Sequence, residues 1–202
     1  MVSRTQELVR LLEEDQQESR IMGRAFFQAD NTNLVDQQKN IMRKRDQRAK
    51  KALQILKEIG DPSISNLGVA GAQAMSILAL HASPNVLREV LGASTKLYQR
   101  KAEDTYYQAI PSMTDLLLIL EHHKQRFATQ WLFDKNKQPF LPSVEDFEHV
   151  NERRHLYGIE PLHWPKSLAL PASKQPWLKR PLSELVMRDL TKDEYDELLL
   201  NR

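Results

Sequence analysis

The chain has 202 residues, of which 41% are hydrophobic and 28% are charged, and its formal net charge is +2. A chain of this length is typical of one domain and can bury a sizeable core. The near balance of charges gives no strong attraction to nucleic acid or to an anionic membrane. The absence of cysteine excludes disulfides, thiolate catalysis and cysteine-bound metals.

The first residues, Met-Val-Ser-Arg-Thr-Gln-Glu, are polar and do not resemble a secretion signal. No apolar run approaches the roughly 18 residues that a membrane-spanning helix needs. The longest runs, "AMSILAL" and "MTDLLLIL", fit buried core helices. We therefore expect a soluble, cytoplasmic protein with no membrane segment.

Apolar residues three and four positions apart predict amphipathic helices through the first 123 residues. Gly60-Asp61-Pro62 is expected to stop one of these helices, and Pro84 suits the first turn of another. In chain order, the expected helices span residues 3–29, 34–59, 70–82, 85–100 and 111–123, with a loop at 63–68 and a helical continuation at 102–108.

After residue 123 the composition changes. β-Branched and aromatic residues around a polar turn predict a short β-hairpin near 126–141. Residues 143–158 predict a last helix, which Ser143 can cap and Gly158 can end. Within that helix, Glu145 stands four residues before His149, so a pair between them is expected.

Five prolines between residues 159 and 181 predict an extended segment without regular structure. We expect Trp164 and Trp177 to pack this segment on the helical domain or on a second copy of the chain. Thr191 and Glu194 form a capping-box pattern before a short helix. The predicted fold is a mainly α, single-domain helical bundle over residues 1–158 with one hairpin, followed by a Pro-rich C-terminal extension over 159–202.

Two patterns suggest ligands but have simpler explanations. The basic run at 43–51 resembles a phosphate-contacting helix, yet acids stand nearby and no aromatic residues interleave it, so we interpret it as a solvated helix face and expect no nucleic acid. His122 and His123 suggest a metal, but adjacent helical residues point about 100° apart. No metal-binding spacing, phosphate-binding loop or nucleotide fingerprint is present, so we expect no metal and no cofactor.

His81 follows an apolar run and precedes Ser83-Pro84. The helix macrodipole favours a histidine at a helix C-terminus without any function. The other interpretation is an acid–base group in a pocket. On the predicted last helix, Arg153 and Arg154 can bind a carboxylate or phosphate, or equally the C-terminal tail or a buried acid.

The chain resembles the bacterial domain-of-unknown-function 6624 family over about residues 8–165. The resemblance rests on four spaced segments: "EEDQQESR", "LGVAGAQAMSILALHASP", "KQRFATQWLFD" and "VNERRHLYGIEPL". The family's motif residues match Asp15, Gln16, Arg20, His81, Ala82, Gln125, Thr129, Gln130, Val150, Arg153 and Arg154. The chain departs from the pattern at Leu80, Ser83 and Ala128, where the family usually has Gln, Asp and Gly.

The resemblance implies a set of site residues but no established activity, so whether the protein is an enzyme stays open. The candidate catalytic residue is His81, as an acid or base. The candidate ligand-binding residues are Gln16, Arg20, Thr129, Gln130 and Arg153. We expect His81, Gln130, Arg20 and Gln16 to meet in one cleft that binds a small polar or anionic ligand, and we consider a homodimer. The alternative is an adaptor or immunity-type interaction protein in which these residues form a structural hydrogen-bond network.

Overall fold

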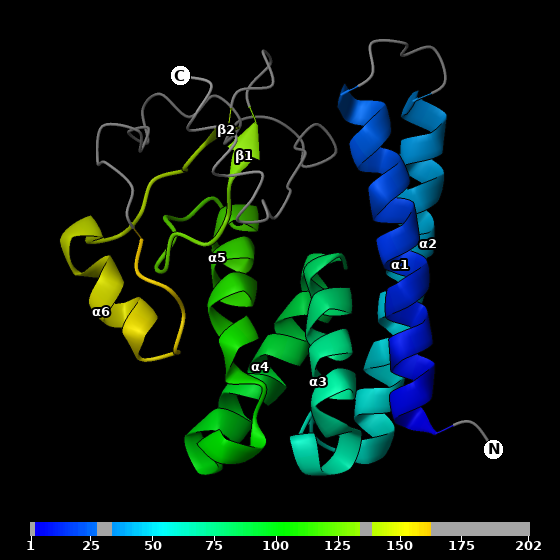
Figure 1. The fold of residues 1–202 in the computed structure, drawn as a ribbon, viewed down its shortest axis with the longest axis horizontal. Coiled ribbons are helices and arrows are strands. Elements are labelled where there is room, and N and C mark those ends of the chain that lie inside the picture. Colours follow the sequence, from blue (N-terminus) through cyan, green and yellow to red (C-terminus); the bar gives the residue numbers. More distant parts are fainter. Residues whose placement is uncertain (1–2, 28–33, 134–138, 163–202) are drawn as a thin grey trace. The chain divides into compact units, whose positions relative to one another are not determined.

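The computed structural model describes residues 3–27, 34–133 and 139–162 of the chain. The described part is mainly helical, as the sequence predicts, with six α-helices (Figure 1). They are α1 (Arg4–Phe27), α2 (Leu34–Ile59), α3 (Ile64–Leu80), α4 (Pro84–Arg100), α5 (Ile110–Leu120) and α6 (Val150–His155). The chain divides into two units, Met1–Met113 and Thr114–Arg202. This division falls inside the segment that the sequence predicts as one domain.

In the first unit, α1 and α2 run side by side, and α3 packs against both of them (Figure 1). A reciprocal cap starts α1: the Ser3 hydroxyl accepts from the backbone N–H of Gln6, and the Gln6 side chain accepts from the N–H of Ser3. α2 ends at Ile59, and Gly60 follows in the left-handed region with a φ of 89°, as the Gly-Asp-Pro signal predicts.

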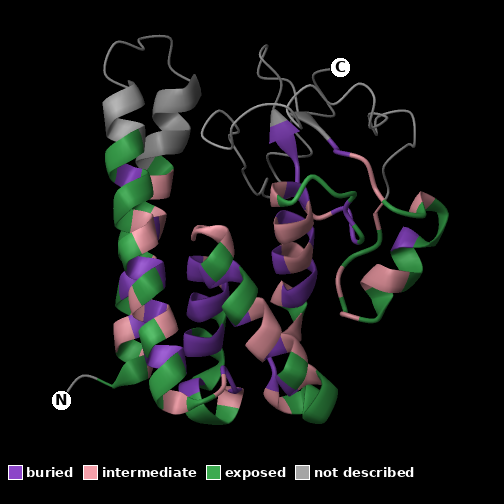
Figure 2. Cartoon of the chain, turned by 180° about the vertical axis from the view of Figure 1, so that it is seen from behind, coloured by how far each residue is buried: buried purple, intermediate pink, exposed green. Residues whose placement is uncertain are grey.

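One side of α3 is buried, and its small residues let its neighbours approach closely (Figure 2). Its buried residues are Leu67, Gly71, Ala72, Ala74, Met75, Ser76, Leu78 and Ala79. On α1, Leu8 and Leu11 are buried, and on α2 the buried side includes Ala49, Ala52 and Ile55. The core of the first unit therefore lies between α3 and the facing sides of its neighbours.

The prediction of a loop at 63–68 is wrong. Ser63 caps α3, and its hydroxyl accepts from the N–H of Asn66, so the helix begins at Ile64. The loop-like composition marks a kink instead, at Gly68, where φ is 65°. Thr5 of α1 donates a hydrogen bond to the carbonyl of Leu67 over 2.8 Å, which satisfies a group at this kink.

Residues 102–108 do not continue a helix. Lys101, with φ −150° and ψ 76°, breaks the regular geometry, and two short 3-10 turns follow at Ala102–Asp104 and Tyr107–Ala109. α5 then begins at Ile110 and ends at Leu120, three residues before the predicted end, and His122 adopts a φ of 62°.

In the second unit, β1 (Leu132–Phe133) pairs with β2 (Pro139–Phe140) in antiparallel register. Residues 134–138 lie outside the described residues, so a complete hairpin stays a prediction. A small core forms from Ala128, Trp131, Leu141 and Val150.

The predicted helix over 143–158 is much shorter in the structure. Gln125 and Val144 form a parallel bridge, because the N–H of Gln125 donates to the Ser143 carbonyl and the N–H of Glu145 donates to the Gln125 carbonyl. These bonds pair Val144 with Gln125 where the helix was expected to begin, so Ser143 does not cap a helix. A 3-10 turn at Phe147–His149 leads into α6. Consequently His149 contacts Asp146 over 2.9 Å rather than the predicted Glu145.

The Pro-rich extension lies outside the described residues from 163 on, together with Trp164 and Trp177, so its predicted packing is not tested. Among the described helices, none combines the length and the apolar character that crossing a membrane would require.

Candidate functional site

The first unit brings His81 and Asp15 together. His81 is the residue that ends α3, and its side chain is 24% exposed. Asp15 lies on α1 and is completely buried. The ring nitrogen Nδ1 of His81 is hydrogen-bonded to Oδ2 of Asp15, which joins the C-terminal end of α3 to the middle of α1. A titratable ring and a buried carboxylate thus share one hydrogen bond.

The other oxygen of Asp15 contacts two arginines of α2. The Nη2 atom of Arg48 lies 3.3 Å from Oδ1 of Asp15, and the Nε atom of Arg45 lies 3.6 Å from the same oxygen. Both guanidinium groups are largely buried, with 9% and 14% of their side chains exposed. One buried carboxylate therefore touches two cations and a histidine.

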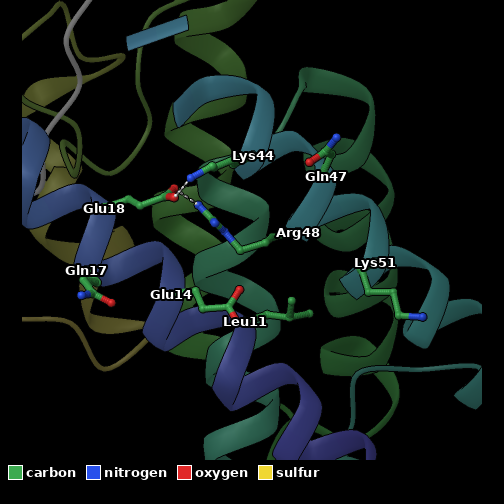
Figure 3. Close-up of a pocket in the computed structure, with 8 residues that line it drawn as sticks. All are labelled: Leu11, Glu14, Gln17, Glu18, Lys44, Gln47, Arg48 and Lys51. Carbon is green, nitrogen blue, oxygen red and sulfur yellow. Dashed lines mark hydrogen bonds and ion pairs between the residues drawn. The ribbon is translucent and has the colours of Figure 1, made fainter. Parts of the chain in front are cut away.

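The arginines are anchored in turn by residues of α1. Glu18 accepts a hydrogen bond from Arg48 and another from Lys44, the latter over 2.9 Å (Figure 3). Arg45 donates to the hydroxyl of Ser19. We call the set Asp15, Glu18, Lys44, Arg45, Arg48 and His81 the α1–α2–α3 network. It includes three members of the basic run at 43–51, which here pair with acids of the same chain.

Electrostatics keep Asp15 ionised. Burial by itself raises the pKa of this carboxyl, because it removes water from the charged form. The hydrogen bond with His81 and the positive charges of Arg45 and Arg48 lower the pKa further than burial raises it. The net result is a pKa below the ordinary value for aspartic acid.

This arrangement determines which histidine nitrogen is available. A carboxylate can only accept, so the Nδ1 atom of His81 carries the proton that it donates to Asp15. In a neutral ring, the lone pair is then on Nε2. Within the part of the chain that the structure describes, Nε2 makes no hydrogen bond. His81 can accordingly accept a proton from a ligand at this atom, or donate one after protonation.

A shallow groove of the first unit runs between α1 and α2. Its lining residues are Leu11, Glu14, Gln17, Glu18, Lys44, Gln47, Arg48 and Lys51 (Figure 3). Glu18, Lys44 and Arg48 belong both to this groove and to the α1–α2–α3 network, whereas His81 does not line it. The groove therefore borders the network at Arg48 and its partners, and not at His81.

Gln16 and Arg20, two predicted ligand-binding residues, also lie on α1. Gln16 is half-buried and Arg20 is exposed. Neither belongs to the α1–α2–α3 network, and their predicted role in binding is not tested.

The second unit contains a separate polar centre around Asp115 of α5, which is completely buried. Its carboxylate accepts hydrogen bonds from the backbone N–H groups of Arg126, Phe127 and Thr129 and from the Thr129 hydroxyl, at 2.7–3.2 Å. Burial raises the pKa of Asp115, and these hydrogen bonds oppose that rise. The predicted ligand-binding residue Thr129 thus has a structural partner.

Gln130 also takes part in the folding of this loop. Its backbone N–H donates to the side chain of the buried Gln125 over 2.8 Å, and its carbonyl accepts from the same side chain over 3.0 Å. Between these residues, Ala128 adopts a φ of 55°, in the region that favours glycine.

Two arginines of α6 hold the same loop through carbonyl groups. Arg153 donates to the carbonyls of Arg126, Glu145 and Asp146, and its Nη1 atom lies 3.4 Å from the Asp146 carboxylate. Arg154 donates to the Phe127 carbonyl over 2.7 Å and to that of Glu160. Both arginines therefore bond mainly backbone carbonyls of the chain, and their predicted binding of a carboxylate or phosphate stays a prediction.

The predicted site residues are therefore divided between the units. His81, Gln16 and Arg20 belong to the first, and Thr129, Gln130 and Arg153 belong to the second. The predicted meeting of His81 and Gln130 in one cleft involves both units and stays a prediction. Among the described residues, no group of three or more His, Asp or Glu side chains is arranged to hold a metal.

Sequence reasoning placed Asp15 in a motif but missed its partners Arg45 and Arg48. A signal was present in the helical spacing. Ile41, Arg45, Arg48, Ala52 and Ile55 recur every three or four residues, so the two arginines share a stripe with buried apolar residues. Asp15 likewise continues the stripe of Leu8 and Leu11. Charged residues on an apolar stripe predict buried, paired charges.

Comparison of the chain with known protein families, with curated proteins and with solved structures finds no match. The resemblance to the domain-of-unknown-function 6624 family stays a prediction.

Proposed function

We propose that the protein is an enzyme or small-molecule binder whose chemical centre is His81, held by Asp15. The observation that carries this proposal is the hydrogen bond from Nδ1 of His81 to a buried carboxylate. Such a bond fixes the ring and directs the lone pair of Nε2 away from Asp15. Proton transfer and the binding of polar ligands both use a histidine oriented in this way.

The charge of the network favours an anionic ligand. Lys44, Arg45 and Arg48 contribute three positive charges, whereas Asp15 and Glu18 contribute two negative charges. A net positive surrounding attracts carboxylates and phosphates. The ligand class that we propose is thus a small polar molecule with an anionic group.

A second candidate is an interaction protein in which the network only joins three helices. The contacts of Arg45 and Arg48 with Asp15 favour it, because they connect α2 to α1 regardless of any ligand. Against it, the Nε atom of Arg48 is buried and has no hydrogen-bond acceptor among the described residues. An unpaired buried donor costs free energy, and a purely structural network has no reason to retain one.

The test is a titration of the protein with inorganic phosphate and, separately, with acetate, followed by NMR of the histidine ring nitrogens. We expect saturable shifts at the His81 ring and loss of binding in His81→Gln. His149→Gln is the matched control, because His149 also bonds an aspartate through Nδ1 but is exposed. If neither anion moves the His81 signals, or if His81→Gln binds as well as the control variant, the proposal is wrong.

A further inference from the structure

The contact between Arg48 and one oxygen of Asp15 affects how the other oxygen is placed against His81. Oδ2 of Asp15 bonds Nδ1 of the ring, and Oδ1 bonds Arg48. A carboxylate with one oxygen fixed cannot rotate freely about its last side-chain bond. The arginine on Oδ1 therefore controls where Oδ2 points.

We propose that Arg48 is a positioning residue for His81, which rests on the proposed function of that histidine. Arg48 acts through Asp15: it orients the carboxylate, and the carboxylate selects the ring form that has its proton on Nδ1 and its lone pair on Nε2. Without this orientation, the two neutral forms of the imidazole become closer in population, and the share of rings with a free Nε2 falls.

Arg48 is better suited to this role than Arg45. Its contact with Oδ1 is shorter, 3.3 Å against 3.6 Å, and it satisfies the criteria of a hydrogen bond. Its side chain is also more buried. In addition, the same Nη2 atom that bonds Asp15 also bonds Glu18, so Arg48 is held from two sides.

The chain of contacts extends to the groove between α1 and α2. Lys44 bonds Glu18, Glu18 bonds Arg48, Arg48 bonds Asp15 and Asp15 bonds His81, in an unbroken order. The first three of these residues line the groove (Figure 3). Removing Glu18 should consequently loosen Arg48 and disturb His81 in the same direction, to a smaller extent.

The experiment measures the ¹⁵N chemical shifts of the His81 ring at about pH 8.5, where a histidine of ordinary pKa is neutral. In the full-length wild type we expect Nδ1 to be the protonated nitrogen. In Arg48→Gln we expect both ring nitrogens to move toward the average of the two forms, and in Glu18→Gln to move partway. Lys51→Gln is the matched control: Lys51 lines the same groove and pairs with an acid of α1, Glu7, but does not contact Asp15.

Arg48→Gln shifts no larger than those of Lys51→Gln would overturn the proposal. If Arg48→Gln does not fold, Glu18→Gln decides: a shift beyond that of the control supports the role of Arg48, and no shift overturns it. Because the measurement needs no ligand, it tests the role of Arg48 separately from ligand binding by His81. If the His81 ring of the wild type carries its proton on Nε2, the proposed function is contradicted. If the wild-type ring carries its proton on Nδ1 but the ¹⁵N shifts do not change in Arg48→Gln and Glu18→Gln, only the role of Arg48 is contradicted.

Discussion

Asp15 is the buried acid of the first unit that contacts three basic side chains, those of His81, Arg45 and Arg48. Removing its charge leaves two largely buried cations without their shared partner, and breaking a buried pair in this way costs about 3 kcal/mol or more. We therefore expect Asp15→Asn to lower the free energy of unfolding by about 3 kcal/mol at pH 7, measured by urea denaturation.

The same variant has a characteristic pH dependence. The pKa of Asp15 is lower in the folded protein than in the unfolded chain, where it is about 3.9. Its stabilising contribution is therefore present above about pH 4 and is lost as the pH falls through the folded pKa. The difference in unfolding free energy between wild type and Asp15→Asn should shrink over this range. A difference that stays constant down to pH 2 would show that the charge of Asp15 does not stabilise the fold.

Asp115 has a comparable importance for the loop at 126–129. Its carboxylate accepts from three backbone N–H groups and one hydroxyl, all of which lose an acceptor in Asp115→Ala. Leaving a buried donor unsatisfied costs about 1–3 kcal/mol, and we expect a loss of about 3 kcal/mol in total as part of the loop rehydrates. Exposed Glu152 provides the control, and Glu152→Ala should change stability by no more than about 0.5 kcal/mol. Equal stabilities of the two variants would contradict the structural role of Asp115.

Among the helices, the crossing of α1 and α3 depends on Gly71. A Cβ atom at this position would lie 3.0 Å from Cβ of Leu67 and 3.3 Å from Cγ2 of Thr5 on α1. Overpacking of this kind typically costs about 1–3 kcal/mol, so we expect Gly71→Ala to destabilise the protein despite the better helix propensity of alanine.

Gly92 of α4 is the matched control for this substitution, because nothing lies within 4 Å of a Cβ atom there. Gly92→Ala should stabilise the protein by up to about 1 kcal/mol. Thermal denaturation of both variants checks the pair. If Gly71→Ala is as stable as Gly92→Ala, the conclusion that the close packing of α1 against α3 requires glycine at position 71 is wrong.

Helical periodicity was sufficient to predict α1, α2 and α4 nearly to their ends, because each carries a regular apolar stripe and a clear stop or start signal. It failed where long-range bonds override local preference. Thr5 stabilises the kink at Gly68, and Gln125 forms a bridge with Val144. Both of these partners are distant in sequence. The contacts of Asp15 with His81 and Arg48 were missed for the same reason, since both residues are far from Asp15 along the chain.

The whole molecule divides between Met113 and Thr114, which predicts that the first unit folds without the second. A fragment of residues 1–113 contains the whole first unit, including α1 to α4. We expect it to be helical by circular dichroism, to unfold cooperatively on heating and to keep the His81 ring form of the full chain. A fragment without a cooperative transition would contradict the division into units.

The proposed function and the role of Arg48 both require the hydrogen bond between His81 and Asp15. The most direct test is a long-range ¹H–¹⁵N correlation spectrum of the His81 ring in the full-length protein at about pH 8.5. The account predicts a protonated Nδ1 and an unprotonated Nε2, with the preference weakened in Asp15→Asn. A ring protonated on Nε2, or a spectrum that Asp15→Asn leaves unchanged, would contradict it.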